Sequence, residues 1–193
     1  MTTKTNVAIF VSGKGSNALK IIQHFKSSSC VKIGLVLSNN EGALALEKAR
    51  NLGVETVVFD NQSLIKKSFV LNFLIHKKIQ FIVLAGFLRQ IPAEIVQYYA
   101  KKMVNIHPSL LPKYGGKGMF GMRVHEAVIK NQEKESGITI HYVSELYDKG
   151  AIIFQKKISV EKEDNSNTLA KKVQCLEHHY FPITLQKLLC NDV

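Results

Sequence analysis

Two polar side chains that stand two positions apart, Asn105 and His107, are the first candidates for chemistry in this sequence. A short apolar run leads into them, and residues i and i+2 of a β-strand lie on one face, so both are expected to project together. Pro108 follows and has no N–H to donate, so it predicts the end of the strand. An amide can hydrogen-bond a developing oxyanion, and an imidazole can transfer a proton near neutral pH. The spacing alone also allows a loop cap beside a buried histidine.

A glycine-containing loop, Ser12-Gly13-Lys14-Gly15-Ser16-Asn17, lies between the first apolar run and the first helical pattern. Glycines let backbone N–H groups approach an anion, and a helix N-terminus favours negative charge. The loop lacks the Gly-Lys-Ser/Thr of a Walker motif. The expected second strand ends in Ser38-Asn39-Asn40 rather than in the acid that a dinucleotide-binding fold needs. The loop therefore predicts a monophosphate site, with a ligand-free strand-to-helix turn as the alternative.

The elements that would position these groups alternate between strand-length apolar runs and helical patterns. This alternation predicts an α/β fold with a doubly wound, mostly parallel sheet. A long glycine-rich loop over residues 108–122 follows, and two neighbouring strands after it predict an antiparallel C-terminal part. Asn165, Ser166 or Asn167 would cap the last helix, and Pro182 predicts a kink or a break within it. The expected strands are 7–11, 31–37, 54–59, 81–85, 103–106, 138–143 and 152–160, and the expected helices are 18–25, 43–52, 64–75, 92–99, 124–129 and 169–189.

Size and composition suit one domain, because 193 residues with an apolar fraction of 46% can bury a real core. No apolar run reaches the roughly 20 residues that a membrane helix needs, and the N-terminal apolar stretch is too short for a signal peptide. The formal charge of +11 comes almost entirely from scattered lysines, which predicts a solvated surface, with anionic small molecules or RNA as the alternative partners. Three widely spaced cysteines show no disulfide framework and no zinc spacing, so we expect a reducing cytoplasm.

Several separated segments agree with one known pattern. They are Ser12-Gly13-Lys14-Gly15-Ser16-Asn17, Leu84-Ala85-Gly86-Phe87-Leu88-Arg89, Asn105-Ile106-His107-Pro108-Ser109-Leu110-Leu111-Pro112, Ile140-His141-Tyr142-Val143, Asp148-Lys149-Gly150-Ala151-Ile152-Ile153 and Glu177-His178. In these segments, and in their order along nearly the whole chain, the sequence resembles phosphoribosylglycinamide formyltransferases, folate-dependent enzymes of purine synthesis. The Asn-x-His with a downstream Asp is specific for folate formyl transfer as a class, and the glycine loop narrows the class to a ribonucleotide acceptor.

The resemblance implies a Rossmann-like formyltransferase fold. It also implies an enzyme that transfers a formyl group from 10-formyltetrahydrofolate to the amine of glycinamide ribonucleotide and needs no metal. It implies that Asn105, His107 and Asp148 form the catalytic set. Asp148 is expected to favour the imidazolium form of His107, because a nearby opposite charge raises the pKa of a histidine. The nucleophile is the substrate's own amine.

Binding roles follow from the same resemblance. Glu177 would contact the ribonucleotide, and a phosphate-binding half over about residues 1–100 would precede a catalytic and folate-binding half over about residues 101–193. The residues expected to hold the phosphate are Ser12, Gly13, Lys14, Gly15, Ser16 and Asn17, and those expected to border the folate are Leu88, Arg89 and His141.

Two places depart from the family pattern. Lys14 stands where the family usually has a smaller or neutral polar residue, and it could add to phosphate affinity or point to solvent. The glycine-rich stretch over residues 114–122 is longer than the common version of the family. His24, His76 and His125 have no apparent constellation around them.

Three alternatives stay open. A methionyl-tRNA formyltransferase core or a formyltetrahydrofolate hydrolase would share the chemistry, but each of those families carries a further domain that we do not expect here. A nucleic-acid-binding module would use the basic surface, but the sequence lacks interleaved aromatic and Arg residues. We therefore expect small-molecule partners, no nucleic acid and no membrane, with a homodimer as an open option.

Overall fold

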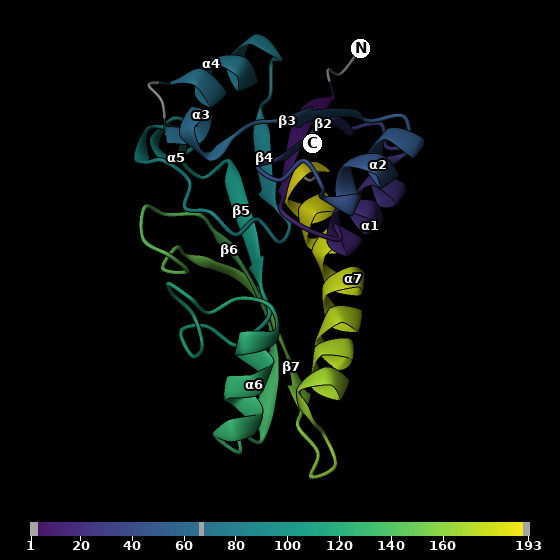
Figure 1. The fold of residues 1–193 in the computed structure, drawn as a ribbon. Coiled ribbons are helices and arrows are strands. Elements are labelled where there is room, and N and C mark those ends of the chain that lie inside the picture. The colour runs from purple at the N-terminus through teal and green to yellow at the C-terminus, as the bar shows by residue number, and fades with distance from the viewer. Residues whose placement is uncertain (1–3, 66–67, 191–193) are drawn as a thin grey trace.

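A single twisted sheet forms the centre of the computed structural model, which describes residues 4–65 and 68–190 (Figure 1). The strand order is β3-β2-β1-β4-β5-β6-β7, and neighbours from β3 to β5 pair parallel. Strands β6 and β7 then pair antiparallel. The predicted α/β class, mostly parallel with an antiparallel C-terminal part, is confirmed. The strands are β1 (Thr5–Val11), β2 (Val31–Ser38), β3 (Glu55–Val58), β4 (Phe81–Leu84), β5 (Met103–His107), β6 (Glu135–Tyr142) and β7 (Ile152–Ser159).

The parallel strands are continuous apolar runs because helices cover both faces of the sheet. In β1, Val7, Ile9 and Val11 belong to one hydrophobic cluster, whereas Ala8 and Phe10 belong to the other. Helices α1, α2, α6 and α7 contribute to the first cluster, and α3, α4 and α5 contribute to the second. The helices are α1 (Ser16–Phe25), α2 (Leu44–Asn51), α3 (Asn61–Ile65), α4 (Phe69–His76), α5 (Ala93–Tyr98), α6 (Met122–Lys130) and α7 (Ser166–Cys190).

The single helix expected over residues 64–75 is wrong, because α3 ends at Ile65 and α4 begins at Phe69. Residues 66–67 of that prediction lie outside the described residues. Ser68 has a left-handed φ of 54°, which a helix interior does not allow. Its N–H and its hydroxyl both donate to the Glu94 carboxylate, at 3.0 and 2.9 Å. This tertiary contact holds the break in place.

Helix α7 runs from Ser166 to Cys190 without interruption, so of the kink or break predicted at Pro182 the break does not occur. Pro182 and its neighbour Phe181 are buried, and this packing holds the helix together despite the missing N–H. Asn165 caps the helix as predicted, since its side-chain oxygen accepts from the N–H groups of residues 167 and 168 at 2.9 and 3.1 Å. Across the described ranges, no helix is both long enough and apolar enough to span a membrane.

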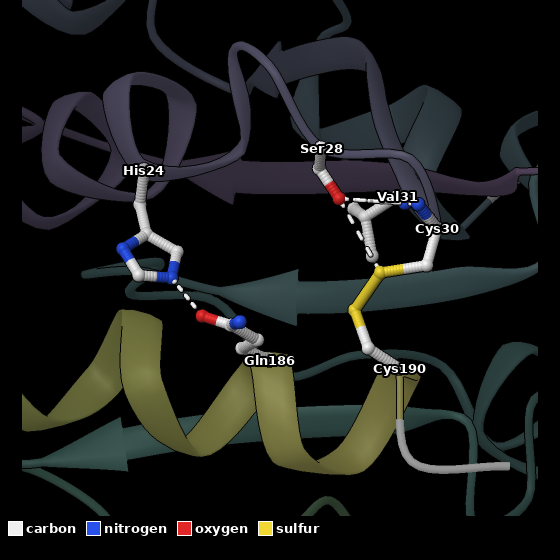
Figure 2. The surroundings of a disulfide bond; sticks show 6 residues. All are labelled: His24, Ser28, Cys30, Val31, Gln186 and Cys190. Carbon is white, nitrogen blue, oxygen red and sulfur yellow. Dashed lines mark hydrogen bonds between the residues drawn. A yellow bond between two sulfur atoms is a disulfide. The ribbon is translucent and has the colours of Figure 1, made fainter. Parts of the chain in front are cut away.

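The expectation of no disulfide is also wrong. Cys30, just before β2, bonds Cys190 at the end of α7, with their Cα atoms 5.6 Å apart (Figure 2). The two cysteines lie 160 residues apart in sequence, so spacing along the chain gives no sign of the pair. Cys175 is free and exposed. The reducing cytoplasm was expected because no disulfide was expected, so cysteine usage no longer supports that compartment.

The order of the strands in the sheet has a switch point between the neighbouring strands β1 and β4. Strands β2 and β3 extend the sheet on one side of β1, and β4 and β5 extend it on the other. The loops after β1 and β4 meet at this switch point, where the Ser12 N–H donates to the Gly86 carbonyl at 3.1 Å. In open α/β sheets, ligands bind at such a crevice beyond the carboxyl ends of the strands.

Candidate active site

Strand β5 presents the Asn-x-His pair as predicted. Val104 and Ile106 belong to the first hydrophobic cluster, so Asn105 and His107 occupy the opposite face of the strand. Both residues line a cavity of about 480 Å³. The antiparallel register of β6 sets His141 directly opposite Asn105. Two side chains distant in sequence therefore become neighbours through sheet pairing.

His141 orients the Asn105 amide. The Nδ1–H of His141 donates to the Tyr142 carbonyl at 2.8 Å, because a carbonyl can only accept. In the neutral ring Nε2 is then an acceptor, and it receives a hydrogen bond from Nδ2 of Asn105 at 3.1 Å. The second N–H of that amide is left for a ligand. Asn105 can therefore act as a fixed donor on the cavity wall.

Asp148 lies between β6 and β7 and connects two histidines. Its Oδ1 is 3.6 Å from Nε2 of His141, and its Oδ2 is 3.6 Å from Nδ1 of His107. Oδ2 also accepts the Gly116 N–H at 2.8 Å. Burial works to raise the pKa of Asp148, but the neighbouring His141 and His107 rings and the Gly116 N–H outweigh it and lower the pKa. The carboxylate is therefore ionised at neutral pH.

His107 is held on its other side by the backbone. Its Nε2–H donates to the Tyr114 carbonyl at 2.7 Å, so in the neutral ring Nδ1 is the unprotonated nitrogen. Burial is the largest influence and lowers the pKa of His107, while Asp148 and the Tyr114 carbonyl act to raise it. The net shift is downward. Asp148 favours the imidazolium as expected, since it acts to raise the pKa of His107, but burial of the ring outweighs the carboxylate.

His125 belongs to this neighbourhood, although the sequence showed no constellation around it. It lies on α6 and is only 5% exposed. Burial, together with the nearby His107 ring, lowers the pKa of His125 to about 4. Its Nδ1 has no hydrogen-bond partner among residues 4–65 and 68–190. A lone histidine on an amphipathic helix carries no local pattern by which this proximity could have been predicted.

The cavity gathers most of the predicted site residues. Asn105, His107, His141 and Asp148 line one part of it, and the glycine-rich segment Gly116–Gly121 forms another wall. Tyr114 and Gly116, whose backbone groups bond His107 and Asp148, are site residues that the sequence reasoning missed. Backbone groups leave no side-chain signature. The other predicted residues on the wall are Leu88, Arg89, Asn17 and Glu177.

The loop after β1 has the geometry of an anion site. Gly15 has a φ of +68°, and a Cβ there would collide with Ala45, so the position needs glycine. No acceptor within the described residues takes the N–H groups of residues 13–17, which surround the start of α1. Lys14 is exposed. The Ser12 side chain is not free for a ligand, because its hydroxyl donates to Asn39 at 2.8 Å and accepts the Leu88 N–H at 3.1 Å.

Glu177 on α7 meets this loop. Its Oε2 accepts from Nδ2 of Asn17 at 2.9 Å, and both residues face the cavity. Burial raises the pKa of Glu177, while the Asn17 hydrogen bond lowers it by less. Within the described part of the chain, no group of three His, Cys, Asp or Glu residues could hold a metal ion.

The class of protein follows from comparison of the whole chain. The model of the formyl transferase family matches residues 5–185, and this chain belongs to that family. A phosphoribosylglycinamide formyltransferase of Escherichia coli is 32% identical over 185 residues, which are 93% of this chain and 85% of the relative. The crystal structure of phosphoribosylglycinamide formyltransferase from Bacillus halodurans superposes with a TM-score of 0.88 at 37% identity and covers 97% of both chains. Within the family, the chain groups with these proteins.

Longer relatives exist as well. The chloroplastic phosphoribosylglycinamide formyltransferase of Arabidopsis thaliana is 37% identical over 184 residues. The match covers 92% of this chain but 63% of the Arabidopsis protein. The chain therefore spans a little under two thirds of that relative.

Proposed function

We propose that this protein transfers the formyl group of 10-formyltetrahydrofolate to the amine of glycinamide ribonucleotide, a step of purine synthesis. One observation carries the proposal: Asn105, His107 and Asp148 line the same cavity as Asn17 and Glu177, beside a loop of free backbone N–H groups. The relatives described above bear the name of this enzyme. Their names favour the ribonucleotide over tRNA or water as the acceptor.

Asn105 is proposed to stabilise the tetrahedral intermediate. Attack of the amine on the formyl carbon places negative charge on the oxygen and positive charge on the nitrogen. The N–H of Asn105 that His141 does not occupy can donate to that oxygen. One such contact is worth about 3–4 kcal/mol of barrier. The two ring nitrogens of His141 are engaged inside the protein, which supports a role in orienting Asn105 rather than a polar contact with folate.

The His107–Asp148 pair is proposed to accept the proton that leaves the attacking nitrogen. With a neutral ring and an ionised carboxylate, the pair carries one negative charge inside a largely buried site. Protonation makes the pair neutral overall as the amine loses its charge. Holding both substrates in one cavity supplies a further large part of the rate.

The remaining groups are proposed to bind the two substrates. The N–H groups of residues 13–17 would hold the phosphate at the N-terminus of α1, while Ser12 shapes the loop from behind. Glu177 would contact the ribonucleotide. Leu88 is 48% exposed on the cavity wall and offers an apolar surface for a folate ring, and Arg89 beside it offers a cation for a carboxylate. With these roles, Leu88 and Arg89 from the expected phosphate-binding half would bind folate. Glu177 from the expected folate-binding half would bind the ribonucleotide.

The wider context is proposed on the same basis. We expect small-molecule partners and no nucleic acid. The chloroplastic relatives show that this kind of enzyme also works in an organelle.

The test is direct turnover. The purified protein is incubated with 10-formyltetrahydrofolate and glycinamide ribonucleotide, and loss of the formyl donor is followed by absorbance. We expect loss only when both substrates are present. No turnover by folded protein would reject the proposal, and turnover without the ribonucleotide would point to hydrolysis instead.

A further inference from the structure

Helices α1 and α7 lie side by side and run in the same direction. Three hydrogen bonds join the two helices in sequence order along this α1–α7 seam, and a disulfide closes it beyond the end of α1 (Figure 1); Figure 2 shows the last hydrogen bond and the disulfide. The partners are Ser16 with Gln174 at 3.3 Å, Asn17 with Glu177 at 2.9 Å, His24 with Gln186 at 2.6 Å, and the Cys30–Cys190 disulfide.

The seam has a ligand end and a covalent end. Asn17 and Glu177 line the cavity, and Ser16 belongs to the loop with free N–H groups. The disulfide closes the opposite end, about 20 Å along α7 from Glu177 at 1.5 Å per residue. The position of Glu177 relative to the loop is therefore set by how α7 lies on α1.

Pro182 lies between Glu177 and the covalent end. It removes one backbone hydrogen bond from α7, although the helix stays continuous through this turn. Beyond it, the last turns are held to the α1 side by Gln186 and by Cys190. Opening the disulfide leaves the His24–Gln186 hydrogen bond and the packing of Leu185 in the first hydrophobic cluster at that end of the seam.

The disulfide is accessible to a reductant, and a neighbouring hydroxyl can stabilise one of its sulfurs as a leaving group. Both cysteines are half-buried, so a reductant can reach them. The Ser28 hydroxyl lies 3.3 Å from Sγ of Cys30 and must be the donor, because a disulfide sulfur carries no hydrogen. This donor would stabilise a departing Cys30 thiolate, which directs attack to the Cys190 sulfur.

We propose that the Cys30–Cys190 disulfide is a redox-responsive clasp that sets the affinity for the ribonucleotide, by holding α7 and Glu177 against the start of α1. The inference rests on the proposed function, since it assigns Glu177 to that substrate. Cys30 and Cys190 are positioning residues and touch no substrate.

The redox step needs a dithiol reductant. One thiolate of the reductant attacks Sγ of Cys190, forms a mixed disulfide and expels Cys30 as a thiolate, which takes up a proton. The second thiolate of the reductant then displaces Cys190. The protein gains two thiols, and the reductant becomes a disulfide.

The test measures substrate binding and kinetics in both redox states of the full chain. Before treatment with dithiothreitol the protein should show one reactive thiol, that of Cys175, and afterwards all three cysteines should react. Reduction should weaken calorimetric binding of glycinamide ribonucleotide, and raise its KM, by about three- to ten-fold. The KM for the folate and kcat should change by less than about two-fold, because the folate wall and the Asn105 strand lie off the seam.

Variants separate the clasp from other thiol effects. The double variant Cys30→Ser/Cys190→Ser should match the reduced protein and ignore dithiothreitol, whereas Cys175→Ser should respond as the wild type does. If the double variant does not fold, the redox titration of the wild type decides alone.

Contrary outcomes are distinct. Equal ribonucleotide affinity in both redox states, a parallel loss of folate affinity and kcat, or three reactive thiols before reduction would each overturn the clasp. Failure to bind ribonucleotide in either state would overturn the proposed function, and the clasp with it.

Discussion

Asp148 and His107 meet with Oδ2 of the carboxylate 3.6 Å from Nδ1 of the imidazole. The other ring nitrogen donates to the Tyr114 carbonyl, so the ring has one fixed orientation. Burial lowers the pKa of the imidazole, while the Gly116 N–H and the two histidine rings lower the pKa of the carboxylate. The pair can therefore take up one proton without creating a net positive charge.

Asn105→Ala should lower kcat by about 10²–10³-fold with little change in substrate affinity, because it removes the proposed oxyanion donor. Steady-state kinetics and calorimetric binding of both substrates check this. The matched control is Asn72→Ala, an exposed asparagine on α4, which should leave kcat unchanged. A near-normal kcat for Asn105→Ala would remove the residue from the mechanism.

The pH profile should report His107. Because its pKa is lowered from 6.5 and the neutral ring is the active form, kcat/KM should hold at neutral pH and fall as pH drops through that lowered value. Asp148→Asn should lower kcat by about 10²–10⁴-fold. It should also move the inflection to lower pH, because the carboxylate acts to raise the pKa of His107.

Asp164→Asn is the control for this profile, since it removes a carboxylate that pairs with Lys172 away from the cavity. Its pH profile should match that of the wild type. An unchanged inflection in Asp148→Asn would contradict the assigned coupling between Asp148 and His107.

Gly15→Ala should weaken ribonucleotide binding and lower the free energy of unfolding by about 1–3 kcal/mol, from the positive φ and the collision with Ala45. Gly13→Ala is the matched control in the same loop, because a Cβ there meets nothing within 4 Å. Denaturant unfolding and calorimetry measure both effects. Equal behaviour of the two variants would mean that the loop tolerates a shifted backbone at residue 15.

His125 should make the protein acid-sensitive. Its pKa in the folded state is about 4, below the ordinary 6.5, so protons bind the unfolded state more readily. The His125 contribution is therefore complete above about pH 6.5 and declines as pH falls toward 4, by up to about 3 kcal/mol. Denaturant unfolding at pH 7 and pH 4 should show a smaller acid loss for His125→Gln than for the wild type.

The exposed His76 gives the comparison for that experiment. His76→Gln should retain the full acid loss of the wild type. Identical pH dependence in His125→Gln and the wild type would show that other groups account for the acid sensitivity.

The sequence predicts the site where its geometry is local. Residues i and i+2 of a strand share a face, so Asn105 and His107 could be paired without coordinates. The loop around Gly15 could be predicted for the same reason, since it joins one strand to one helix. Asp148 and Glu177 entered through family resemblance, because their proximity to the site depends on the whole fold.

What the sequence could not predict depends on tertiary contacts. The lowered pKa of His107 follows from burial of the ring, and the position of His125 follows from how α6 packs. The Cys30–Cys190 bond joins residues 160 positions apart. The break near Ser68 depends on Glu94 of a later helix.

Backbone groups of residues 114 and 116, at the start of the glycine-rich wall, hold the two catalytic side chains in place. The Tyr114 carbonyl holds His107, and the Gly116 N–H holds Asp148, so two neighbouring peptide groups hold both partners of the proton acceptor. If this wall moved outward, His107 would lose the Tyr114 carbonyl and Asp148 would lose the Gly116 N–H in the same movement. The orientation of the acid–base pair is therefore coupled to the position of the wall.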